Sequence, residues 1–99
     1  MIIRWLPIAI RERGHQIDWY GERNALAAIR MDREIEATVA RLARFPSIGR
    51  VGRLKRTYEI TVQRTRFVLI YHLADTEIVV LRLMHSSQRW PAAIDLDDD

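Results

Sequence analysis

Two apolar runs near the C-terminus constrain the fold of this chain more than any other feature. Phe67 to Leu73 (FVLIYHL) is continuously apolar apart from His72, and Ile78 to Met84 has Arg82 as its single charge. Runs of this kind are typical of central strands that are covered on both faces of a sheet. The spacer between them, ADTE, has the length of a hairpin connection. We therefore predict two neighbouring strands at the centre of a small, mainly antiparallel sheet.

Two helices are predicted before these strands. Apolar residues recur at helical spacing from Ile8 to Arg23, and at heptad spacing from Ala25 to Arg44. Asn24 separates the two segments and suits the N-cap of the second. Gly14 weakens the first helix, because glycine costs about 1 kcal/mol relative to alanine in a helix interior. Two helices joined by so few residues form an antiparallel helical hairpin.

The remaining segments complete the order β-α-α-β-β-β. Ile2 to Leu6 is a short apolar run that suits a strand, and residues 47–53 (SIGRVGR) suit a loop. Between residues 57 and 62 Tyr58, Ile60 and Val62 alternate with polar residues, as in a half-exposed strand. The sequence thus predicts an α+β fold: an N-terminal strand and a helical hairpin packed on a small sheet. We expect one domain over residues 1–94, followed by an acidic tail, residues 95–99.

Composition excludes several classes of protein. The chain has no cysteine, so it can form neither disulfides nor thiolate metal sites. No apolar run reaches the roughly 18 residues that a membrane span needs. We expect a cytoplasmic protein without cofactor, metal, membrane or small-molecule substrate.

Charge is distributed unevenly along the chain. There are 16 Lys and Arg against 13 Asp and Glu, and four of the acids lie in the last five residues. Between Arg44 and Arg66 there are seven bases and one acid, Glu59. Such a basic segment attracts an acidic partner or a nucleic acid, or else it is an ordinary solvated face.

Several segments, taken in order, resemble the RelE/ParE superfamily of bacterial toxins from type II toxin–antitoxin systems, and more closely its ParE branch. The resemblance covers roughly residues 2–91. The matching segments are IRWLPIA, GERN, FPSIGRVGR, TYEI, FVLIY and VVLRLMHSSQRWP. One departure is Tyr58, which stands where the family usually has arginine between threonine and glutamate.

The resemblance implies two alternative activities. ParE-like members poison DNA gyrase, whereas RelE-like members are ribosome-dependent endoribonucleases of mRNA; both are neutralised by an antitoxin whose C-terminal segment wraps around the toxin. The cations with which such nucleases hold the message fall at about Glu59, Thr61 and Val68 here, and these side chains cannot stabilise a phosphate. We therefore expect an inhibitor of gyrase, bound at the A subunit and neutralised by a ParD-like antitoxin. The alternative is an endoribonuclease.

Candidate site residues follow from both alternatives. A nuclease would use His85 with Arg89 or Arg66, and the convergence of Lys55, Arg56, Arg66 and His85 on one concave spot would favour it. Residues expected to bind the target or the antitoxin are Arg50, Arg53, Lys55, Arg56, Arg82, His85, Arg89 and Trp90.

Two of these residues have competing interpretations. In one interpretation His85 forms hydrogen bonds at the end of the last strand, and Trp90 packs over the core. In the others His85 contacts the target or transfers a proton. Arg82 is expected on the strand face of Val80 and Met84. On an uncovered face it would bind a partner; on the helix side it would need a buried acid.

Overall fold

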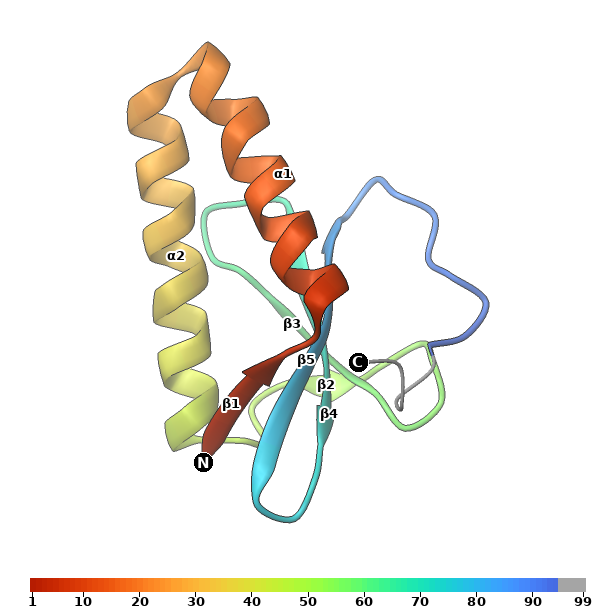
Figure 1. Cartoon of the computed structure of the whole chain (residues 1–99). Helices are drawn as coiled ribbons and strands as arrows, with labels where there is room; N and C mark the ends of the chain where they lie inside the picture. Colours follow the sequence, from red (N-terminus) through yellow and green to blue (C-terminus); the bar gives the residue numbers. More distant parts are fainter. Residues whose placement is uncertain (95–99) are drawn as a thin grey trace.

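The computed structural model describes residues 1–94, so the predicted acidic tail lies outside the described residues. The fold is α+β, with two helices and five strands (Figure 1). In chain order the elements are β1 (Ile2–Trp5), α1 (Pro7–Arg23), α2 (Ala25–Arg44), β2 (Arg50–Val51), β3 (Tyr58–Thr61), β4 (Phe67–Leu73) and β5 (Glu77–His85). This order confirms the predicted architecture. One element was missed: the two-residue strand β2 lies within the segment predicted as a loop.

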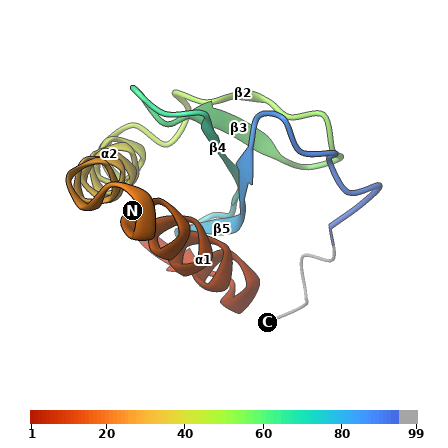
Figure 2. The same ribbon diagram turned by 90° about the horizontal axis from the view of Figure 1, so that it is seen from above.

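The five strands form one sheet in the order β1-β5-β4-β3-β2. β1 pairs in parallel with β5, and the other neighbours are antiparallel. In Figure 2 both helices lie to one side of β4 and β5, and the segment after β5 lies to the other. β1 and β2 are therefore the edge strands, each with one row of main-chain groups unpaired in the ladder.

Local sequence signals explain the helix ends. Pro7 occupies the first turn of α1, where its fixed φ fits and no N–H is needed. Asn24 caps α2, and its Oδ1 accepts a hydrogen bond from the main-chain N–H of Ala27 at 3.0 Å. The chain leaves α2 at Phe45, just before Pro46.

The core has two parts, one on each face of the sheet. Between the sheet and the helices lie Ile35, Leu42, Phe67 and Tyr71, among others. On the opposite face Leu6, Ile70, Val79, Leu81 and Met84 form a second cluster, against which Trp90 and Ile94 pack. The central strands are thus covered on both faces, as their continuous apolar runs predict.

A β-bulge interrupts the pairing of β4 with β5. Ile70 pairs with Arg82 while Tyr71 pairs with Val80, so Leu81 is the extra residue. The bulge shifts the alternation of side chains along β5: Val80 belongs to the helix-side cluster and Met84 to the opposite one. Arg82 pairs with Ile70 of the opposite cluster, so the prediction that it shares a face with both Val80 and Met84 is wrong for Val80.

Candidate functional site

The basic segment after β2 is organised around a buried carboxylate. Glu59 is only 1% exposed, although it is one of the polar residues of a strand predicted to be half-exposed. Its Oε2 accepts a hydrogen bond from the main-chain N–H of Arg53 at 2.8 Å, and its Oε1 lies 3.3 Å from Nη2 of Arg50 and 3.4 Å from Nε of Arg53. Burial raises the pKa of Glu59, but these contacts outweigh burial and lower it overall. Arg50 and Arg53 therefore neutralise an internal acid.

Arg53 also connects this segment to the C-terminal part of the chain. Its guanidinium stacks on the ring of Trp90, with Cζ 3.7 Å from the ring centroid. Trp90 packs against the second core cluster, as one interpretation of the sequence predicts. A single arginine thus links the carboxylate of Glu59 to the indole, and both predicted binding residues, Arg53 and Trp90, have a structural role.

Lys55 and Arg56 differ from these two arginines. Both are exposed, and within residues 1–94 neither side chain forms a hydrogen bond, an ion pair or a ring contact. Arg56 has a φ of 61°, in the left-handed region that non-glycine residues avoid. Of the four cations from Arg50 to Arg56, these two remain available to a partner.

Arg82 forms an ion pair with a partly buried acid on α1. Its Nε and Nη2 donate to the two carboxylate oxygens of Glu12 on α1, at 2.9 and 2.7 Å. The two side chains are about one fifth exposed, and the hydrogen bonds to Glu12 raise the pKa of Arg82. Of the two interpretations, the structure therefore supports the structural one.

His85 is held at the end of β5 by the turn that follows it. Its Nδ1 accepts a hydrogen bond from the main-chain N–H of Ser87 at 3.2 Å and lies 2.7 Å from the hydroxyl of Ser87. Because a main-chain N–H can only donate, the neutral imidazole must carry its proton on Nε2. The ring borders a hollow of about 320 Å³ that is also lined by His15, Trp19 and Gln88. In this tautomer the remaining ring nitrogen, Nε2, is a hydrogen-bond donor, whereas a general base needs an open lone pair.

The four residues whose convergence would favour a nuclease lie at two ends of β4. Arg66 lies beside His85, because the main-chain N–H of Ser86 donates to the Arg66 carbonyl at 2.7 Å. Arg56 lies beside His72, whose Nδ1 is 3.0 Å from the Arg56 carbonyl oxygen. Since Phe67 pairs with His85, about five residues of β4 separate these two ends, roughly 17 Å at strand spacing. Arg89 is exposed and without a hydrogen bond or ion pair in the described part of the chain.

A groove that the sequence did not predict lies between β1 and the helices. It has a volume of about 700 Å³, and its lining includes Ile3, Trp5, Ile10, Gly14 and Ile17. It therefore runs along the edge strand β1 and is mainly apolar. The sequence feature that could have indicated this groove is Gly14, a glycine in a helix interior. In the structure, a Cβ at this position would meet no atom within 4 Å.

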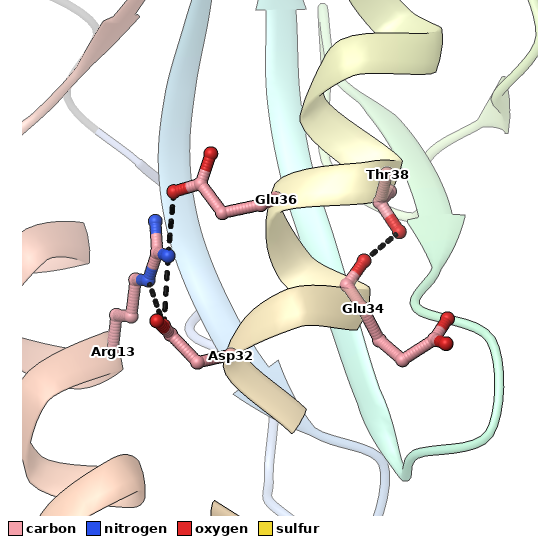
Figure 3. A network of polar contacts seen from close by, with 5 residues as sticks. All are labelled: Arg13, Asp32, Glu34, Glu36 and Thr38. Carbon is pink, nitrogen blue, oxygen red and sulfur yellow. Dashed lines mark hydrogen bonds and ion pairs between the residues drawn. The ribbon is translucent and has the colours of Figure 1, made fainter. Parts of the chain in front are cut away.

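Arg13 joins the two helices beside this groove. Its Nε and Nη2 lie 3.0 and 2.8 Å from Oδ1 of Asp32, and Nη2 lies 2.7 Å from Oε1 of Glu36 (Figure 3). Burial lowers the pKa of Arg13, but the two α2 carboxylates outweigh burial and raise it. Figure 3 also shows Thr38 donating to the carbonyl of Glu34. The contacts of Arg13 with Asp32 and Glu36 join α1 to α2 beside the groove.

Among residues 1–94, no three side chains of His, Asp or Glu are grouped so that they could hold a metal ion. Neither helix in that range is long and apolar enough to cross a bilayer.

Comparison with known proteins gives three similarities. The family model described as "ParE toxin of type II toxin-antitoxin system, parDE" matches residues 3–90. The curated protein "Putative toxin Y4kP" of Sinorhizobium fredii is 33% identical over 93 residues, which cover 93% of this chain and 95% of that protein. The solved structure "Chromosomal ParDE TA system from P. aeruginosa" matches with a TM-score of 0.78 at 20% identity, over 86% of this chain and 95% of that one. The structural match is a similarity of fold.

Proposed function

Because this chain belongs to the ParE family of toxins from type II toxin–antitoxin systems, we propose that it inhibits growth by binding and poisoning DNA gyrase. The proposed contact is with the A subunit, and a ParD-like antitoxin neutralises the toxin. The toxin acts by binding to gyrase, without a nucleolytic step of its own.

The observation that supports this proposal most is the separation of Lys55 and Arg56 from His85. Metal-free cleavage of RNA needs a base, an acid and positive charge around one phosphate. Here Lys55 and Arg56 lie at one end of β4, while Arg66 and His85 lie at the other. Glu59, near the position of a nuclease cation, is instead a buried acid with its own arginine partners.

The experiment is a gyrase assay with purified toxin and supercoiled plasmid. We expect linear, protein-linked DNA to accumulate, and we expect premixing with the cognate antitoxin to prevent it. Unaffected gyrase at an excess of toxin would contradict the proposal. Primer extension on translated mRNA tests the alternative in parallel: codon-phased cuts that disappear in His85→Ala would establish the endoribonuclease.

We further propose that the antitoxin covers the helical hairpin at the apolar groove. β1 is an edge strand that borders this groove, so an antitoxin segment can add a strand or a helix beside the sheet. Acidic residues of the antitoxin are expected to bind the arginines between Arg44 and Arg66. Added salt should therefore slow association more than it speeds dissociation. An association rate that rises with salt would contradict this electrostatic part.

A further inference from the structure

Two arginines of this chain adopt a backbone conformation that favours glycine. Arg56 has a φ of 61° and Arg64 a φ of 63°, and both lie in turns next to β3. In this region the Cβ of an L-residue crowds its own main chain, so glycine or asparagine would be the more stable choice. The guanidinium of Arg64 has an internal contact, 3.0 Å from Oε1 of Glu34. Within residues 1–94 the side chain of Arg56 has no hydrogen bond, ion pair or ring contact that would offset this strain.

The turn that carries Lys55 and Arg56 is fixed by main-chain and side-chain hydrogen bonds. The N–H of Gly52 donates to the Thr57 carbonyl at 2.8 Å, and the hydroxyl of Thr57 donates to the Leu54 carbonyl at 2.6 Å. His72 supports the Arg56 carbonyl from β4. These hydrogen bonds fix the main chain of the turn that carries the two exposed cations. Binding of an anionic partner would therefore cost little entropy for ordering the turn.

The surface around this turn indicates the class of partner. Protein interfaces depend on exposed aromatic or aliphatic anchors. In the described chain, no large apolar side chain is exposed between residues 52 and 66, and the nearest one before them is Val51 on β2. Glu59 offsets one of the two charges of Arg50 and Arg53, so most of the charge without an internal partner belongs to Lys55 and Arg56. Isolated cations without apolar anchors are typical of contacts to a phosphodiester backbone.

We propose that Lys55 and Arg56 contact the backbone of double-stranded DNA directly. The inference rests on the proposed function only for the source of that DNA, namely the duplex that gyrase holds. The contact is electrostatic and independent of sequence, and the strain of Arg56 is retained because its guanidinium binds phosphate.

The test uses the full chain and a fluorescein-labelled 20-base-pair DNA duplex of arbitrary sequence. Fluorescence anisotropy is measured from low to physiological salt, because non-specific affinities at physiological salt are only about 10⁻⁴ to 10⁻⁶ M. We expect Lys55→Gln and Arg56→Gln each to reduce the slope of log K against log salt by about 0.9. Absence of duplex binding by the unmodified chain at low salt would overturn the proposal.

A matched pair of variants separates the contribution of the Lys55–Arg56 turn to DNA affinity from the effects of net charge and of backbone strain. Arg56→Gly and Arg64→Gly remove the same charge and relieve the same type of backbone strain, at opposite ends of β3. We expect both proteins to melt a few degrees higher, while only Arg56→Gly loses DNA affinity by several fold. Equal losses of affinity in the two variants would show a general effect of charge and overturn the proposal.

The outcomes also separate this inference from the proposed function. If the toxin binds the duplex through Arg56 but leaves gyrase untouched, the proposed function fails and this inference stands. If the toxin traps gyrase but Arg56→Gly binds the duplex as the unmodified chain does, this inference fails and the proposed function stands.

Discussion

Glu12 on α1 and Arg82 on β5 form a two-point ion pair between residues that are 70 positions apart in the chain. Oε1 of Glu12 also accepts a hydrogen bond from the main-chain N–H of Leu83 at 3.1 Å. β1 pairs with β5 only as far as Val80, so Leu83 lies where the parallel ladder has ended. One carboxylate therefore neutralises an arginine and satisfies a main-chain group that β1 no longer reaches.

The Glu12–Arg82 pair should be important for stability. Glu12→Gln leaves a poorly solvated guanidinium without its counter-charge, and we expect a loss of about 2 kcal/mol in the free energy of unfolding. The control is Glu34→Gln, which breaks the pair with the 74% exposed Arg64 and should cost less than about 1 kcal/mol. Urea denaturation measures both values, and equal losses would contradict the structural role of the pair.

Glu59 should make stability depend on pH in the acidic range. Its pKa in the folded protein lies below the ordinary value of 4.5, because the contacts with Arg53 and Arg50 outweigh burial. The unfolded chain therefore binds the proton more readily, so this stabilisation is present above about pH 4.5 and is lost as the pH falls through the folded pKa. Glu59→Gln should thus cost more stability at pH 7 than at pH 3. Equal losses in urea denaturation at the two pH values would contradict this assignment.

Tyr71 and Gly49 should be coupled. The buried hydroxyl of Tyr71 accepts from the N–H of Gly49 at 3.0 Å and donates to the Pro46 carbonyl at 3.1 Å. A Cβ on Gly49 would collide with this hydroxyl and lie 2.8 Å from Cε1 of the ring. We expect Gly49→Ala and Tyr71→Phe each to cost about 1–3 kcal/mol. Their combination should cost less than the sum, because the phenylalanine removes the worst contact; additive losses would contradict the predicted clash.

The apolar pattern explains how much of the fold was predictable. Helix α2 and strand β4 begin and end where their periodicity and flanking residues indicate, because each depends on local propensity and on burial of a whole face. The bulge at Leu81 was not predictable in this way. The apolar character of β5 is the same with or without a bulge. The bulge nevertheless reverses which side chains of the residues after it face the helices.

The candidate site was less predictable than the fold. Local sequence identified the basic segment between Arg50 and Arg56, but it could not separate the arginines that neutralise Glu59 from the two cations that remain exposed. That distinction depends on the path of the turn, which directs the N–H of Arg53 at the carboxylate. The groove beside β1 is built from segments that meet only in the folded protein.

The two sheet histidines should be opposite tautomers. His85 accepts a main-chain N–H at Nδ1 and must carry its proton on Nε2, whereas His72 donates from Nδ1 to the Arg56 carbonyl. Long-range ¹H–¹⁵N spectra of the rings above pH 8 distinguish the two tautomers directly. If His85 functions as a donor, His85→Gln should retain more toxicity than His85→Ala. A neutral His85 protonated on Nδ1 would contradict this assignment.

Substitutions of Gly14 should change the affinity for the antitoxin without disrupting the fold. A Cβ at this position meets no atom within 4 Å, so Gly14→Ala should raise the free energy of unfolding by about 1 kcal/mol through helix propensity alone. Gly14→Trp projects a large side chain into the groove, and we expect it to leave the fold intact while weakening antitoxin binding by at least about 10-fold, or 1.4 kcal/mol. Arg33→Trp, at an exposed position of α2 that is not part of the groove lining, is the control. Calorimetric titration with the antitoxin measures the affinities, and an unchanged affinity of Gly14→Trp would place the antitoxin on another surface.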